Sequence, residues 1–216
     1  PDPRAYSYLR NRLDQTQLPY LVIPGNHDDR SMVYEAFKDL GYYPNNQSFL
    51  HFVSDDYPLR FIALDTLDPE TGEAKLCKKR LNWIRARLNE QPNRSTVIIM
   101  HHQPFLTRMP FTSKHAFPGA QELEAIVSKS KNIQGIFCGH LHRPIFSRWG
   151  GSIAVVAPSI TMQRTLTLNN GMRKETIGEP VSIPLYLWRQ GSELICHLSF
   201  IGTFGDPFPL IKAPPI

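Results

Sequence analysis

The sequence predicts an α/β domain built in layers, in which helices alternate with the buried strands of a sheet. The chain has 216 residues, 41% of them hydrophobic, which is enough to bury a sizeable core. Short apolar runs rich in branched residues alternate with segments whose apolar residues recur at helical spacing. Such an alternation is typical of layered α/β proteins.

Four apolar runs are predicted as buried strands because each is short, rich in branched residues and followed by polar residues. They cover residues 20–23, 61–64, 96–100 and 135–138. Helices are predicted between them at residues 4–13, 32–40, 78–89 and 120–130. The third helix shows the periodicity clearly, since Leu81, Ile84 and Leu88 recur on one face.

Beyond residue 150 the pattern changes to strands alone. Strands are predicted at residues 152–157, 183–188 and 194–201, with a polar loop over residues 168–179. Residues 205–216 contain four prolines, which favour irregular chain. We therefore expect one domain over residues 1–202 and a proline-rich C-terminal tail at residues 203–216.

Composition argues against several classes of protein. The 24 basic and 19 acidic residues give a net charge of +5, but they are scattered, which argues against a nucleic-acid groove. No apolar run is long enough to span a bilayer, so no membrane association is expected. The cysteines Cys77, Cys138 and Cys196 form no Cys-x-x-Cys pair, which favours reduced thiols and a cytoplasmic location.

Three polar clusters each begin where a predicted strand ends. They are Pro-Gly-Asn-His-Asp-Asp at residues 24–29, His-His-Gln-Pro at 101–104 and Gly-His-Leu-His at 139–142. Proteins of the α/β class assemble ligand sites at the carboxyl ends of their strands. The shared placement therefore predicts one common site.

The two histidine clusters are the first candidates for metal ligands. His140 and His142 are two residues apart, so on an extended segment they would point to the same side and could serve two metals about 3.5–4 Å apart. Gly139 before them permits close backbone approach or a bend. Alone, each cluster has a second explanation: a His-x-His at a strand end is often a surface feature, and one of His101 and His102 is often a structural residue.

The Asn26 cluster can supply both ligand and acid. The amide oxygen of Asn26 is a weak ligand alone but a plausible one beside two histidines and a carboxylate. His27 would point to the opposite side of the chain, where an imidazolium could donate a proton to a leaving oxygen, and Asp28 could orient that imidazole. The alternative is a turn that caps the helix beginning near Met32.

In order and spacing, Gly-Asn-His-Asp, Met-His-His-x-Pro and Gly-His-Leu-His resemble the signature of the calcineurin-like metallophosphoesterase superfamily. The chain is further similar to the bacterial class III 3′,5′-cyclic-nucleotide phosphodiesterases of the Icc/CpdA type. This similarity rests on Ile-Ala-Leu-Asp-Thr at 62–66, Ala-Pro-Ser at 157–159, Leu-Tyr-Leu-Trp at 185–188 and Ser-Phe-Ile-Gly at 199–202. The resemblance implies an α/β/β/α sandwich whose N-terminal strand–helix unit is missing here.

The resemblance also implies the roles of the site residues. Asn26, His101 and His140 would bind one metal and His142 the other, with two divalent ions drawn from Mn, Fe, Zn or Co. His101 is preferred over His102 because it directly follows the strand. His27 would be the catalytic acid, oriented by Asp28, while Asn26, His27 and His142 would also contact the substrate.

The function implied is hydrolysis of a small-molecule phosphodiester by a metal-activated hydroxide, with 3′,5′-cyclic nucleotides (cAMP) converted to nucleoside 5′-monophosphates. Glycerophosphodiesters are the alternative substrates. An inactive nucleotide- or partner-binding module is a second alternative. This second alternative arises because the Asp-x-His and Gly-Asp motifs, which in the family precede the position of Asn26, are absent upstream of Asn26 in this sequence. We therefore expect the natural chain to extend upstream by about the length of a βαβ unit, roughly 30 residues or more.

Two surface expectations complete the sequence analysis. The strand-rich C-terminal segment is a candidate contact for a homodimer. Loops over residues 106–119 and 160–178 are expected to border the substrate pocket. There Arg108, His115 and Arg164 could contact phosphate or base, although surface solvation also explains each of them.

Overall fold

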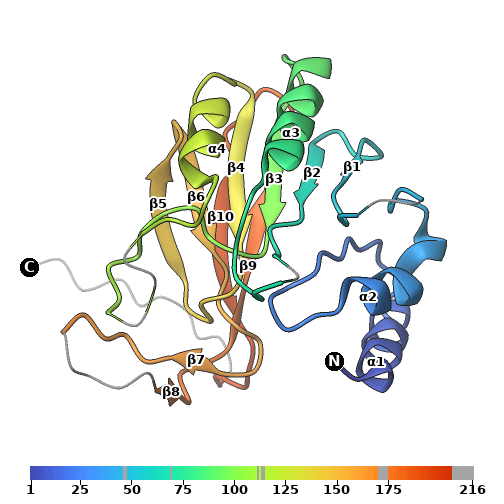
Figure 1. Ribbon diagram of the computed structural model, residues 1–216. Helices are drawn as coiled ribbons and strands as arrows, with labels where there is room; N and C mark the ends of the chain where they lie inside the picture. Colours follow the sequence, from blue (N-terminus) through green and yellow to red (C-terminus); the bar gives the residue numbers. More distant parts are fainter. Residues whose placement is uncertain (46–47, 69, 111, 113–114, 170–174, 206–216) are drawn as a thin grey trace, which may run out of the picture.

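A mixed six-stranded sheet forms the centre of the protein, confirming the predicted α/β class (Figure 1). The computed structural model describes residues 1–45, 48–68, 70–110, 112, 115–169 and 175–205. Strand order is β1–β2–β3–β4–β6–β5, with parallel pairing from β2 through β3 and β4 to β6 and antiparallel strands at both edges. The strands are β1 (Phe52–Ser54), β2 (Arg60–Leu64), β3 (Thr96–Met100), β4 (Ile133–Cys138), β5 (Ile145–Trp149) and β6 (Ser152–Val156).

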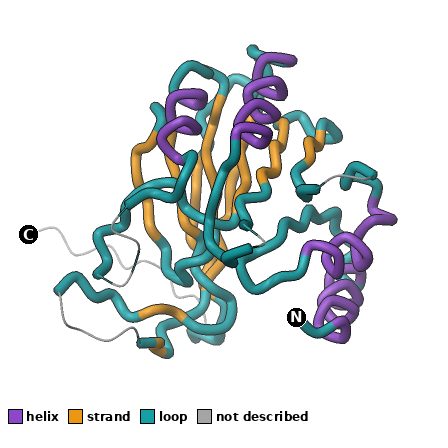
Figure 2. The backbone as a smooth tube through the Cα atoms, in the orientation of Figure 1, coloured by secondary structure: helices purple, strands orange, loops and turns teal. Residues whose placement is uncertain are grey.

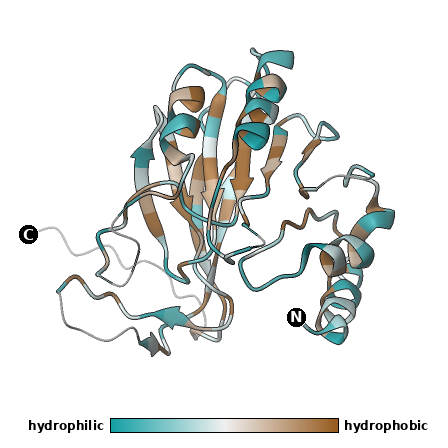
Figure 3. Ribbon diagram, in the orientation of Figure 1, coloured by the Kyte–Doolittle hydropathy of each residue, from teal (hydrophilic) through white to brown (hydrophobic). Residues whose placement is uncertain are grey.

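Helices α3 (Lys78–Glu90) and α4 (Ala120–Val127) cover one face of this sheet and connect its parallel strands, as helical crossovers do. The alternation of side chains along each strand sends every second residue to this face. The resulting buried cluster includes Ile62 and Leu64 of β2, Ile98 and Met100 of β3, Ile136 and Cys138 of β4, and Leu81, Ile84, Leu88, Leu123 and Ile126 of the helices. Apolar residues concentrate along these strands (Figure 3).

A hairpin of β9 (Ser182–Leu187) and β10 (Ile195–Phe200) packs against the opposite face of the sheet. The Phe137 ring of β4, which points away from α3 and α4, stacks on Tyr186 of β9 with 3.8 Å between ring centroids. Helices, sheet and hairpin therefore form successive α, β and β layers, in agreement with the predicted sandwich.

Helices α1 (Pro3–Asp14) and α2 (Arg30–Phe37), followed by the 3₁₀ turn η1 (Lys38–Leu40), lie together beside the β1–β2 end of the sheet (Figure 2). Their side chains Tyr6, Val33 and Phe37 form a second buried cluster that reaches Ala63 of β2. Since Ile62 and Leu64 belong to the first cluster, Ala63 faces the other side of the sheet. All four predicted helices are thus confirmed.

The predicted strand at residues 20–23 is wrong: these residues carry no strand pairing. Two tyrosine hydroxyls hold this backbone instead. The N–H of Val22 donates to the hydroxyl of Tyr42 at 3.1 Å, and the hydroxyl of Tyr43 donates to the carbonyl of Val22 at 2.6 Å. Within the part of the chain that is described, no strand lies alongside to provide a ladder, so the apolar run packs on the second cluster without pairing.

Four strands were not predicted: the edge strands β1 and β5, and the pair β7 (Gln163–Arg164) and β8 (Thr176–Ile177). Strands β1, β7 and β8 have only two or three residues, too few to show a clear alternation, whereas β5 lies at the sheet edge and has few buried residues. Residues 170–174 of the expected 168–179 loop, residues 111, 113 and 114 of the 106–119 loop, and residues 206–216 of the expected tail lie outside the described residues. The division into a domain and a tail stays a prediction.

Candidate metal centre

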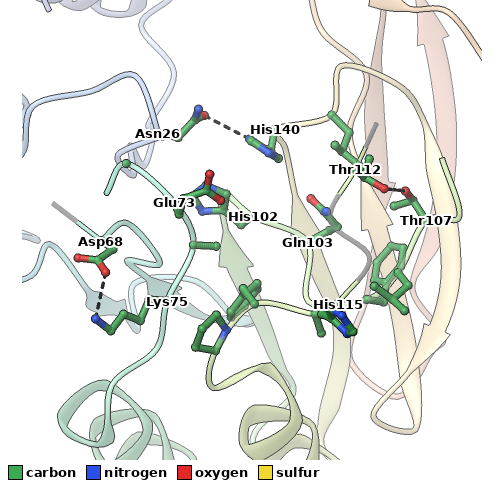
Figure 4. Close-up of a pocket in the computed structure, with 18 of the residues that line it drawn as sticks. Asn26, Asp68, Glu73, Lys75, His102, Gln103, Thr107, Thr112, His115 and His140 are labelled. Atoms are coloured by element: carbon green, nitrogen blue, oxygen red, sulfur yellow. Dashed lines mark hydrogen bonds and ion pairs between the residues drawn. The ribbon is translucent and has the colours of Figure 1, made fainter. Parts of the chain in front are cut away.

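The polar residues that follow β3 and β4 meet at one edge of the sheet. These strands are parallel neighbours, so their carboxyl ends open at the same place. The two loops are joined there, because the N–H of Gly139 donates to the carbonyl of His101 at 2.9 Å. The segment after residues 20–23 arrives at the same edge and brings Asn26 against both loops (Figure 4).

Three of the expected ligands converge on one point. The Oδ1 atom of Asn26 lies 2.8 Å from Nε2 of His101 and 3.2 Å from Nδ1 of His140. One oxygen and two imidazole nitrogens, contributed by three separate segments, therefore meet within hydrogen-bonding distance.

His102 lies beside these residues but has a different partner. Its side chain is buried, and its Nδ1 atom lies 2.8 Å from the Oγ1 atom of Thr66, in the loop that follows β2. Among the described residues, His101, His102 and His140 form the one cluster of three or more His, Cys, Asp or Glu side chains whose ligand atoms lie within 4.8 Å of one another. No described carboxylate joins that cluster.

The loop carrying His140 and His142 is not extended, contrary to the expectation. Both residues have positive φ, 70° for His140 and 53° for His142, in a series of bends. The side chain of Leu141 between them is buried in the core cluster under the sheet, which requires the chain to turn there. Left-handed backbone at residues other than glycine is uncommon and costs roughly 1 kcal/mol per residue. Two such residues in one loop are typical of functional sites.

The glycine that permits close approach is Gly25, where the sequence analysis expected Gly139. A Cβ atom at residue 25 would lie 2.9 Å from Cε1 of His101, closer than such atoms pack. At residue 139 the nearest contact, Nδ1 of His101, would be an ordinary 3.6 Å away. The imidazole of His101 therefore lies directly on the backbone of Gly25.

The turn after Asn26 both presents the site and begins a helix. Asp28 accepts hydrogen bonds from the N–H of Gly25 at 2.7 Å and from the hydroxyl of Tyr6 at 3.1 Å, so its recorded partners fix the turn and do not include His27. Asp29 caps α2 by accepting from the N–H of Met32 at 3.0 Å. The capping role considered as an alternative is thus real and coexists with the site.

The remaining two candidates lie at the border of the centre. His27 is exposed, and the structure places it on the walls of two neighbouring cavities. His142 is half-buried, and its carbonyl accepts the N–H of Arg164 at 2.9 Å. Neither side chain shares the oxygen of Asn26.

Burial keeps the central histidines neutral. It lowers the pKa of His101 and His140 to about 4 and that of His102 to about 3, and the mutual repulsion of the neighbouring imidazoles adds to the effect. Burial lowers the pKa of His142 as well, with Arg164 contributing. Only neutral imidazole binds a metal ion. Neutral nitrogens and an amide oxygen converging on one point are a donor set that suits a divalent transition metal.

A cavity of about 1040 Å³ opens beside the centre. Asn26, His27, His102, His140 and Arg164 line one part of it. The loops that follow β2 and β3 supply the other walls, including the ion pair between Lys75 and Asp68 (3.1 Å, Figure 4) and the apolar side chains Phe105, Leu106, Phe117 and Pro118.

Sheet, loops and donor set together define an α/β protein with a candidate site for a divalent transition metal. Residues 2–144 match the family model described as Calcineurin-like phosphoesterase, and the chain belongs to that family. Within the described residues, none of the helices has the length and apolar character needed to cross a membrane.

Two curated relatives illustrate the range of the family. The chain is 28% identical over 205 residues to a protein of Arcobacter nitrofigilis named probable glycerophosphodiester phosphodiesterase GpdQ, covering 94% of this chain and 75% of the relative. It is 25% identical over 159 residues to the 3′,5′-cyclic adenosine monophosphate phosphodiesterase CpdA of Escherichia coli K12, covering 74% of this chain and 56% of CpdA. The match thus spans little more than half the length of that second relative.

Solved structures show the same fold. A dimetal phosphatase from Danio rerio superposes with a TM-score of 0.54 at 11% identity, covering 72% of this chain and 65% of that one. The protein TT1561 of Thermus thermophilus superposes with a TM-score of 0.52 at 13% identity, covering 82% and 79%.

Proposed function

We propose that this protein is a metal-dependent hydrolase of small-molecule phosphodiesters that works with two divalent metal ions. The observation that carries the proposal is the convergence of Asn26 Oδ1, His101 Nε2 and His140 Nδ1 on one point. The donors come from three segments far apart in the sequence, and burial keeps the imidazoles neutral. Membership of the phosphoesterase family supports the same chemistry.

Asn26, His101 and His140 would hold one metal ion, and His142 would contribute to the second. His102 would stay with Thr66 and support the ligands from behind. Imidazole and amide donors suit Mn, Fe, Zn or Co. When bound, such ions supply Lewis acidity at the phosphoryl group and a hydroxide nucleophile at neutral pH.

His27 would act as the general acid. It is exposed, follows Asn26 directly and lies on the cavity wall, where its imidazolium can donate a proton to the departing oxygen. Asp28 would serve catalysis by holding the turn through Gly25 and Tyr6. Asn26, His27 and His142 would contact the phosphate of the substrate.

We place 3′,5′-cyclic nucleotides, cAMP among them, first as substrates. The apolar cavity wall of Phe105, Leu106 and Phe117 offers a surface for a nucleobase, and relatives such as CpdA are named for cAMP. Water would add hydroxide to phosphorus and a proton to the 3′ oxygen of ribose, giving the nucleoside 5′-monophosphate. A cytoplasmic location and a homodimer remain predictions.

Glycerophosphodiesters are the second candidate substrates. The observation that favours them is the similarity to the probable glycerophosphodiester phosphodiesterase GpdQ over 94% of this chain. The metal ions would contact only the phosphate group. Cyclic nucleotides and glycerophosphodiesters would therefore differ in which parts of the substrate contact the cavity walls.

The test combines metal content with turnover. The full-length protein with Mn²⁺ is assayed on bis-p-nitrophenyl phosphate, cAMP and glycerophosphocholine, beside the variants Asn26→Ala and His27→Ala and the control His197→Ala on the exposed face of β10. We expect Asn26→Ala to lose metal, His27→Ala to keep metal but lose about 100-fold or more in kcat, and His197→Ala to match the unmodified protein. A protein that binds metal yet hydrolyses none of the three esters would refute the proposal and favour a binding module.

A further inference from the structure

Arg164 carries a positive charge that no described carboxylate neutralises. Its Nε atom is buried and has no hydrogen-bond partner, and none of the ion pairs among the described residues includes it. Glu179, an acidic residue of this region, pairs with Arg143 instead, with Nη1 and Oε2 3.0 Å apart. The side chain as a whole is half-buried. A cation that is partly withdrawn from water and has no counterion is unfavourable, so such a group is normally completed by an anion.

The backbone of Arg164 is fixed to the metal-binding loop. Its N–H donates to the carbonyl of His142 at 2.9 Å, and its own carbonyl accepts from Nη1 of Arg143 at 2.6 Å. The preceding Gln163 is buried and exchanges two hydrogen bonds with the backbone of Ser159. The position of Arg164 therefore follows that of the loop that carries His140 and His142.

Arg164 shares its cavity with Asn26, His27 and His140. The cavity is also lined by Lys75, whose ammonium group is already paired with Asp68 at 3.1 Å. Lys75 and Arg164 are the two lysine or arginine side chains among the described residues that line this cavity, and Arg164 is the one without a carboxylate partner.

We propose that Arg164 is a phosphate-binding residue, whose guanidinium donates hydrogen bonds to a non-bridging phosphoryl oxygen of a phosphoester held at the Asn26–His140 centre. A guanidinium is always charged and presents several donors in one plane, which suits phosphate oxygens. The inference rests on the proposed function for the identity of the ester, while the phosphate contact itself can be measured without turnover.

The first measurement is the binding of inorganic phosphate to the Mn²⁺-loaded full-length protein, by isothermal titration calorimetry. Arg164→Met keeps the aliphatic stem, Arg164→Lys keeps the charge, and Arg148→Gln on the exposed part of β5 is the matched control. Hydrogen bonds to charged groups are worth enough to change affinity roughly 10- to 100-fold. We expect that loss for Arg164→Met, a smaller loss for Arg164→Lys and none for Arg148→Gln, with equal metal content throughout.

The second measurement is the KM for bis-p-nitrophenyl phosphate, which should rise by a similar factor in Arg164→Met. Unchanged phosphate affinity in a folded, metal-loaded Arg164→Met protein would overturn the proposal, as would an unmodified protein that does not bind phosphate at millimolar concentration. Phosphate binding that depends on Arg164 in a protein without hydrolytic activity would instead refute the proposed function and leave the role of Arg164 standing.

Discussion

The guanidinium of Arg30 binds both carboxylate oxygens of Asp65, with Nε 2.6 Å from Oδ2 and Nη2 3.0 Å from Oδ1. Asp65 is fully buried and follows β2, whereas Arg30 begins α2 four residues after Asn26. The carboxylate also accepts the N–H groups of Leu50 and Leu67. This ion pair therefore fastens the segment that supplies Asn26 to the sheet that supplies His101.

Replacing Asp65 by Asn should destabilise the protein and reduce its metal content. The change leaves the guanidinium of Arg30 in a largely buried place without its counterion, which costs about 3–5 kcal/mol. Urea denaturation gives the free energy of unfolding, and atomic absorption gives the metal content. The control is Asp39→Asn, which breaks an exposed pair with Arg10 and should cost less than about 1 kcal/mol. Equal losses in the two variants would contradict the role given to Asp65.

Thr66→Val should weaken metal binding while leaving the fold unchanged, because the two side chains are similar in size. The hydroxyl of Thr66 is the recorded partner of Nδ1 of His102, so its removal frees an imidazole that packs against His101 and His140. Loss of a group that orients metal ligands typically costs 10- to 100-fold in affinity. Calorimetric titration with Mn²⁺ measures the change. Thr161→Val, at an exposed hydrogen bond with Ser159, should leave the affinity as it is; a wild-type affinity in Thr66→Val would show that His102 needs no partner.

Gly25→Ala should displace the imidazole of His101. The new methyl group would lie 2.9 Å from Cε1 of His101, so the ring must move away from Asn26. We expect lower metal content and a stability loss of roughly 1–3 kcal/mol. Gly139→Ala is the matched control, because its methyl group finds ordinary contacts at 3.6 Å and beyond. The interpretation fails if the two alanine variants bind metal equally well.

Acid should destabilise the protein through His51, which lies outside the metal centre. Burial lowers the pKa of His51 from 6.5 to about 4, so between those values the unfolded chain binds a proton that the folded protein does not. The contribution of His51 to the free energy of unfolding is therefore fully present above pH 6.5. It is lost as the pH drops towards 4, which lowers the free energy of unfolding by roughly 1–3 kcal/mol. His51→Phe, which keeps a ring against Trp83, should flatten this part of the profile.

The measurement is urea denaturation at several pH values between 7 and 4, with a chelator present so that metal binding does not contribute. An identical slope in His51→Phe and in the unmodified protein would assign the acid sensitivity to other groups, the histidines of the metal centre first among them.

The elements buried on both faces were the ones the sequence predicted best. Strands β3 and β4 show apolar runs because both of their faces are covered. One face packs against α3 and α4, while the other is covered by the second cluster at Ile99 of β3 and by Tyr186 at Phe137 of β4. Residues 20–23 form the same kind of apolar run. A strand also needs a neighbouring strand to pair its backbone hydrogen bonds, and the apolar run alone does not show whether such a neighbour is present. Tyr42 and Tyr43 took that role here.

The sequence predicted that the site residues lie at strand ends, but it did not predict which of their side chains contact one another. Alternation along an extended chain placed His140 and His142 on one side, but the burial of Leu141 turned the loop and replaced that geometry. The closeness of Gly25 to His101 depends on residues 76 positions apart, which no local pattern reports. Thr66 had a usable signal, since it follows a predicted strand as the other polar clusters do.

The two tyrosine hydroxyls that bind the backbone of Val22 affect how fast the Asn26 side chain can move away from a bound metal ion. His101 and His140 follow strands that are hydrogen-bonded to a neighbour on each side, whereas the segment leading to Asn26 lacks such a ladder in the described structure and is secured at Val22 by two side-chain contacts. Amide protons in residues 20–26 should therefore exchange with solvent sooner than those of β3 and β4. We therefore expect the asparagine side of the centre to open first, and its opening rate would be an upper limit on the rate at which a bound ion is released.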